Sequence, residues 1–202
     1  MIRHWPFRIA LLWLASAGVA GVADSDDPHA HHHPAPVAAV KITTVNYKLP
    51  RVALVRDDGT KVKFPDEIDD GRPVVLNFIY TTCTAICPIT SSIFQQFQEK
   101  LGAARTGVHL VSISIDPEQD TPARLRDYAQ RFAAGLGWNH YTGTAEGSLA
   151  LQNAFDVYRG DKMRHDPVTL VRAAPGKPWL RIDGFTTADD LLRRYREMLA
   201  AK

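Results

Sequence analysis

Hydrophobic and polar residues follow strand and helix periods in turn along the chain, which predicts a fold of alternating strands and helices. The two strongest strand candidates are nearly continuous apolar runs at residues 74–80 and 109–115. A continuous run is typical of a strand that is covered on both faces. We therefore expect these two strands at the centre of a sheet.

Shorter patterns predict the remaining elements. Residues 52–64 alternate around an Asp-Gly turn, as in a β-hairpin. Apolar residues at helical spacing predict four helices: one after the central strand, with a buried stripe from Ile89 to Leu101, and three that a threonine can cap. The capping candidates are Thr121, Thr144 and Thr186 or Thr187, and short strands are expected at 138–142, 168–171 and 179–182. This order predicts an α/β sandwich with an N-terminal β-hairpin and a central mixed sheet.

The N-terminal part differs from this pattern. Arg3 and Arg8 are followed by an uncharged, mostly apolar run that ends in small residues, so residues 1–23 are predicted to be a signal peptide or an N-terminal anchor. Residues 24–42 are rich in Pro, Ala, Asp and His and predict a disordered linker. The folded domain is expected over residues 43–202.

Four histidines lie in the linker, at His29, His31, His32 and His33. They are either a loose metal-capturing tract or chance histidines in a solvated tether, and the sequence leaves both interpretations open.

The charge balance argues against one class of binding partner, and the predicted export signal indicates the compartment. The net charge of +2 is due to Arg3 and Arg8, because the rest of the chain has equal numbers of basic and acidic residues. This balance argues against nucleic acid as a partner. An exported protein is expected in the periplasm or on the outer face of the inner membrane, where a cysteine pair can form a disulfide and the N-terminus can provide membrane attachment.

Cys83 and Cys87 are the only cysteines, and they follow the strand predicted at 74–80. Pro88 suits the first turn of a helix, so both thiols are expected near a helix N-terminus. Anions are stabilised there, and a thiolate is an anion. A cysteine pair in this place makes the predicted fold thioredoxin-like.

His165 is a candidate third ligand for a metal held by the two thiols. It precedes the strand at 168–171, which we expect beside the central strand. Two thiolates and one imidazole suit Cu(I), with Cu(II) tolerated through the nitrogen. Three ligands leave a position open for passing the metal to a partner. His109 and His140 have no such placement and are interpreted as structural.

Two interpretations without a metal stand beside this one. A structural disulfide is disfavoured, because closing so short a loop restrains little chain entropy. The other is a thiol–disulfide oxidoreductase with Cys83 and Cys87 as its catalytic redox pair, in which Pro167 takes the place of a cis-proline. A peroxidase of the peroxiredoxin kind is disfavoured, because Tyr80 stands where that chemistry uses threonine.

Residues 78–88 (FIYTTCTAICP) and 112–122 (SISIDPEQDTP), with the later His165, resemble the Sco/SenC family of cytochrome c oxidase assembly proteins. The resemblance extends over about residues 45–200. It implies a thioredoxin-like fold with an N-terminal hairpin and copper binding through Cys83, Cys87 and His165. It also implies a role in building the binuclear copper centre of the oxidase, by copper delivery as a metallochaperone, by reduction of the oxidase cysteines, or by both. The implied partner is the copper-bearing subunit of cytochrome c oxidase or another copper acceptor or donor protein.

The chain departs from the family pattern at two positions near these ligands. Thr84 stands where the family usually has proline, and Arg164 stands where it usually has aspartate. An acidic neighbour would orient the imidazole of His165 and raise its basicity. Asp161 or Asp166 is the alternative source of such a carboxylate.

Overall fold

The computed structural model of the chain describes residues 40–201. The predicted signal or anchor segment and the histidine tract lie outside this part. None of the helices in residues 40–201 combines the length and the apolar character needed to cross a lipid bilayer.

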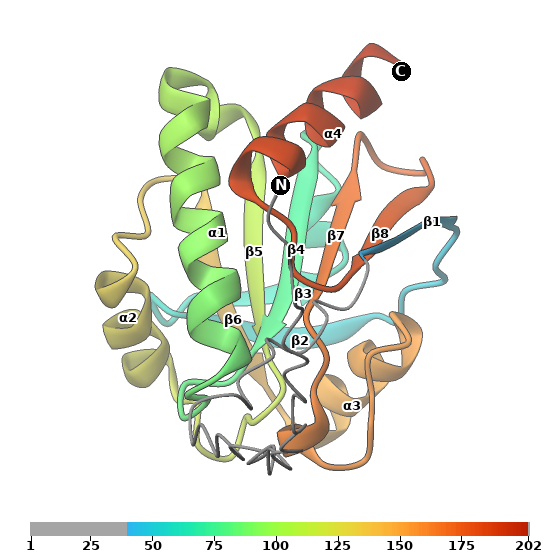
Figure 1. Cartoon of the computed structure of the whole chain (residues 1–202). Coiled ribbons are helices and arrows are strands. Elements are labelled where there is room, and N and C mark those ends of the chain that lie inside the picture. The colour runs from blue at the N-terminus through green and yellow to red at the C-terminus, as the bar shows by residue number, and fades with distance from the viewer. Residues whose placement is uncertain (1–39, 202) are drawn as a thin grey trace, which may run out of the picture. The chain divides into compact units, whose positions relative to one another are not determined.

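A mixed sheet of eight strands forms the centre of the described domain (Figure 1). The strands are β1 (Lys41–Val45), β2 (Val52–Arg56), β3 (Lys61–Phe64), β4 (Val74–Ile79), β5 (His109–Ser114), β6 (Trp138–Gly143), β7 (Val168–Arg172) and β8 (Trp179–Asp183). Their order across the sheet is β1-β8-β7-β4-β5-β6-β2-β3. β4, β5 and β6 are parallel, and the other pairs are antiparallel. The predicted α/β fold with an N-terminal hairpin and a mixed sheet is confirmed.

Helices cover both faces of the sheet. The α-helices are α1 (Ile86–Leu101), α2 (Pro122–Arg131), α3 (Ala145–Ala154) and α4 (Ala188–Ala200), and the 3₁₀ helices are η1 (Asp66–Ile68), η2 (Gly102–Gly107) and η3 (Lys162–Arg164). Figure 1 shows α1 and α4 across one face. In β4, Val75 packs with the residues of α1 and α4, whereas Leu76 packs with Leu151 and Phe155 in and just after α3. The two-sided cover explains why β4 and β5 are continuous apolar runs.

Threonine side chains cap three of the four α-helices in the described domain. Thr121, Thr144 and Thr187 each accept a hydrogen bond from a backbone N–H in the first turn, as predicted. The residue before α1 is Ala85, which provides no side-chain cap. The first N–H groups of α1 are therefore free to bond with the loop that holds the cysteines.

The structure corrects two expectations from the sequence. β1 was not predicted; it begins at Lys41, inside the range predicted as linker, and pairs with β8 along its whole length. Ile89 was expected in the buried stripe of α1 but is 48% exposed. Phe94 and Phe97 carry that contact with the core instead.

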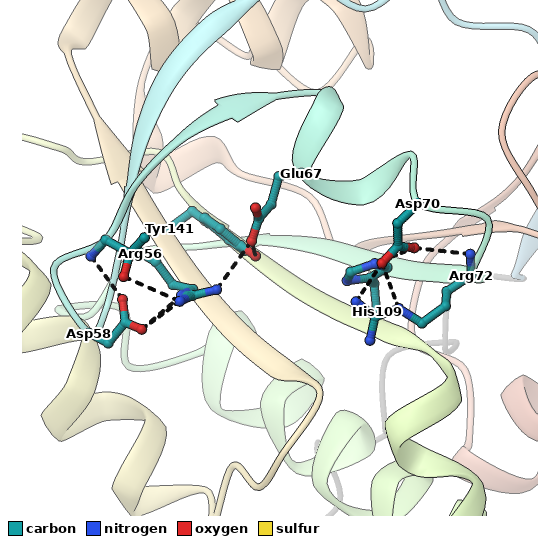
Figure 2. A network of polar contacts seen from close by, with 8 residues as sticks. Arg56, Asp58, Glu67, Asp70, Arg72, His109 and Tyr141 are labelled. Carbon is teal, nitrogen blue, oxygen red and sulfur yellow. Dashed lines mark hydrogen bonds and ion pairs between the residues drawn. The ribbon is translucent and has the colours of Figure 1, made fainter.

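Ion pairs fix the hairpin and the segment after it (Figure 2). Arg56 of β2 contacts both Asp58 and Glu67, and Tyr141 donates to the same Glu67 carboxylate. A second cluster joins Asp70 to Arg72 and to the ring of His109. His109 lies at the start of β5, opposite the end where the cysteines lie, which agrees with its structural interpretation.

Candidate metal and redox site

Strand directions bring the three predicted site residues to one edge of the sheet, the lower one in Figure 1. β4 runs parallel to β5 and antiparallel to β7. The end of β4 therefore lies beside the end of β5 and the start of β7. Cys83 and Cys87 follow β4, and His165 precedes β7, so the sequence prediction that these segments are neighbours is confirmed.

The two cysteines are free thiols at the start of α1. Cys87 lies in the first turn and has no exposed surface, whereas Cys83 in the preceding loop is 9% exposed. The backbone N–H of Cys87 donates to the Sγ atom of Cys83 over 3.3 Å. Helix N–H groups thus point at one sulfur, which is the anion-stabilising arrangement that the sequence predicted.

The environment separates the pKa values of the two thiols. Burial pushes the pKa of Cys83 upward, but hydrogen bonds, of which that from the Cys87 backbone N–H is the strongest, outweigh it, and the net pKa is lowered. Burial raises the pKa of Cys87 far above its ordinary value. Cys83 is therefore the thiol that ionises first and reacts first.

His165 is 6% exposed and is held by a backbone group. Its Nε2 atom lies 3.0 Å from the carbonyl oxygen of Phe78, near the end of β4. A carbonyl can only accept, so Nε2 carries the proton and Nδ1 keeps its lone pair. Burial lowers the pKa of His165, which favours this neutral form. The carbonyl of Phe78 thus orients the ring, the role for which the sequence suggested a neighbouring carboxylate.

Cys83 and His165 line the same small cleft, of about 90 Å³. The other lining residues are Tyr80, Thr82, Thr84, Ala85, Ile86, Lys162 and Met163. Cys87 is not among the lining residues and belongs to a buried cluster that includes Leu125 and Tyr128 of α2. No three His, Cys, Asp or Glu side chains in residues 40–201 stand close enough together to hold a metal ion as they are. The cleft thus brings together two of the three predicted donors, and the three do not meet at a common point.

Asp120 anchors the cysteine loop through hydrogen bonds, a role that the sequence did not reveal. Its fully buried carboxylate accepts hydrogen bonds from the backbone N–H and the hydroxyl of Thr81, and from the hydroxyl of Ser114. Asp116, in the same loop, forms an ion pair of 2.5 Å with Lys162 of η3. The loop between β5 and α2 therefore holds both the cysteine loop and the segment that leads to His165.

The proposed cis-proline is not found at Pro167. In residues 40–201 the cis peptide bond precedes Pro65, and the bond before Pro167 is trans. That detail of the oxidoreductase interpretation is wrong.

Comparisons with known proteins agree on one family. The family model described as SCO1/SenC matches residues 48–199. The SCO1 protein homolog of Bacillus subtilis is 29% identical over 106 residues, which are 52% of this chain and 54% of that protein. The matched segment thus spans about half the length of that relative.

Solved structures show the same fold. Yeast Sco1 with copper bound superposes with a TM-score of 0.66 at 17% identity, over 78% of this chain and 95% of that one. BsSco, described as a member of the Sco family of cytochrome c oxidase assembly proteins with a disulfide switch, gives a TM-score of 0.61 at 24% identity, over 79% of this chain and 98% of that one. At these identities the structural likeness establishes the fold alone.

We predict that Cys83 is alkylated before Cys87 in the reduced, folded protein. Cys83 has some exposure and a lowered pKa, whereas Cys87 is fully buried with a raised pKa. Iodoacetamide labelling followed by peptide mass spectrometry measures the two rates, and the urea-unfolded chain, in which both thiols react alike, is the control. Equal rates in the folded protein would contradict the assignment.

We predict that Asp120→Asn destabilises the protein by about 2 kcal/mol, because an amide nitrogen then faces groups that donate to the carboxylate. Urea unfolding of the reduced protein measures this change. Asp127→Asn, on the exposed surface of α2, is the matched control and is expected to be neutral. A neutral result for Asp120→Asn would mean that the carboxylate does not anchor the loop.

Proposed function

The chain belongs to the SCO1/SenC family, and from this premise we propose that it binds copper and serves in building the binuclear copper centre of cytochrome c oxidase. Cys83, Cys87 and His165 are the proposed ligands. The observation that carries the proposal is the cleft that Cys83 and His165 line together, although they come from segments far apart in the sequence.

The chemistry of these donors fits copper. Thiolates are soft ligands that favour Cu(I), and an imidazole also accommodates Cu(II). A ligating histidine is neutral and usually donates its second ring N–H to a carbonyl or carboxylate. His165 has both properties, since its Nε2–H bonds to Phe78 and burial lowers its pKa. This backbone contact supports His165 as a ligand even though Arg164 stands beside it.

Copper binding requires a local rearrangement. The donors do not form a ready three-ligand group in residues 40–201, and Cys87 is fully buried, which raises its pKa and favours the protonated thiol. We expect the short loop from Thr82 to Ala85 to adjust when copper binds, and the thiols to lose their protons. A site that is assembled by its cargo can also release that cargo to a competing set of ligands.

The proposed partner is the copper-bearing subunit of cytochrome c oxidase or another protein that gives or accepts copper. Yeast Sco1 has been solved with copper bound, and BsSco is described as an oxidase assembly protein. The proposed location is the periplasm or the outer face of the inner membrane, with residues 1–23 as the export signal or anchor.

A metal-independent thiol–disulfide oxidoreductase is the second candidate, and the separated pKa values of Cys83 and Cys87 favour it specifically. Such exchange needs one thiol that ionises readily and attacks and a second thiol that resolves the mixed disulfide. The disulfide switch described for BsSco is compatible with this chemistry in the family.

We predict that the reduced chain binds one Cu(I) ion tightly. His165→Ala is expected to weaken this affinity by roughly tenfold to a hundredfold. Cys83→Ser and Cys87→Ser are expected to abolish tight binding, because each removes a thiolate. Titration against a competing Cu(I) chelator measures all four proteins, and His109→Ala, outside the cleft, is the control expected to behave like wild type.

If His165→Ala binds Cu(I) as tightly as the wild-type chain, His165 is not the third ligand. If the wild-type chain retains no Cu(I) but reduces a protein disulfide with turnover, the oxidoreductase is the better function.

A further inference from the structure

Met163 occupies an unusual position at the mouth of the cleft. It lies in η3 and is 73% exposed, yet its side chain lines the same cleft as Cys83 and His165. The hydroxyl of Tyr80 donates to its Sδ atom over 3.5 Å. This contact holds the thioether beside Tyr80, at the start of the cysteine loop.

Packing does not account for this residue. Met198, the other methionine in residues 40–201, packs on the hydrophobic core from α4, as a gap-filling methionine does. Met163 contributes to none of the hydrophobic clusters of the described domain and stands between two charged residues, Lys162 and Arg164. An exposed thioether in such a turn gains little from burial.

Tyr80 links the thioether to the thiol. Its hydroxyl donates to Met163, and the same side chain lines the cleft with Cys83 and lies in one hydrophobic cluster with it. The thioether of Met163 and the thiol of Cys83 thus have Tyr80 as a common neighbour at the cleft.

We propose that Met163 is an additional sulfur ligand for Cu(I) at the mouth of the cleft. This inference rests on the proposed copper-binding function and extends its ligand set. A thioether is a soft, neutral donor that suits Cu(I) and contributes little to Cu(II). Because Met163 is the most exposed donor, it is also the ligand that an incoming partner meets first.

Replacing Met163 by leucine tests this role, because leucine keeps the apolar bulk and removes the sulfur. Met163→Leu is expected to weaken Cu(I) binding roughly tenfold while Cu(II) affinity stays nearly constant. Met198→Leu makes the same chemical change far from the cleft and is expected to leave both affinities unchanged. Circular dichroism of both variants checks that the fold is intact.

A direct measurement uses the full chain labelled with selenomethionine. X-ray absorption at the copper edge is expected to show a copper–selenium distance in the Cu(I)-loaded wild type and none in labelled Met163→Leu. Because the labelled variant retains the other methionines, the difference reports Met163 alone.

The outcomes distinguish this inference from the function on which it rests. If wild type holds Cu(I), His165→Ala weakens it, and Met163→Leu changes neither affinity nor the absorption spectrum, Met163 is not a ligand and the copper function stands. If the wild-type chain does not retain Cu(I), both proposals are overturned.

Discussion

The pairing of β7 antiparallel to β4 is the constraint on which the candidate site depends. It places the start of β7 at the end of β4, so that His165 reaches the carbonyl of Phe78. If β7 ran parallel to β4, His165 would lie at the opposite edge of the sheet, near the start of β4. The backbone bond to Phe78 then fixes which ring nitrogen keeps a lone pair. One strand direction thus determines both the position and the tautomer of the histidine.

The loop between β5 and α2 provides the second level of support. Asp120 holds Thr81 of the cysteine loop, and Asp116 holds Lys162 in the segment before His165. Both carboxylates are buried but they differ in their partners, since Asp120 bonds to Thr81 and Ser114 inside the domain, whereas Asp116 pairs with Lys162, whose side chain is 39% exposed. A carboxylate bonded to several buried donors costs more to disturb than an ion pair with one partly exposed partner. The cysteine loop is therefore the more firmly held of the two, and the histidine segment has more freedom to adjust.

Local patterns were sufficient to predict most of the fold. The apolar runs of β4 and β5 and the threonine caps depend on neighbours in sequence, and the structure confirms them. β1 was missed because its short sequence KITTV becomes a strand only by pairing with β8, which is distant in the chain. Ile89 has helical spacing, but no element of the described domain buries it.

The sequence predicted which segments meet at the site, but not the contacts between them. The approach of His165 to the cysteine loop followed from the expected strand order, but its orientation by Phe78 depends on a backbone carbonyl, which carries no residue-type signal. Asp120 and Met163 acquire their roles only from partners in other loops, Thr81 and Tyr80. The motif around Asp120 marked the region without indicating its chemistry.

The exposure of the donors suggests how a bound ion would be exchanged under the proposed function. Cys87 is fully buried, His165 and Cys83 are 6% and 9% exposed, and Met163 is 73% exposed. An ion held by the buried donors is shielded from water and from small competitors. Exchange with another protein proceeds by replacing one ligand at a time, and the outermost ligand is the least costly to replace because its loss uncovers no buried charge. A graded series of sulfur and nitrogen donors therefore reconciles firm retention of copper with its release to a partner.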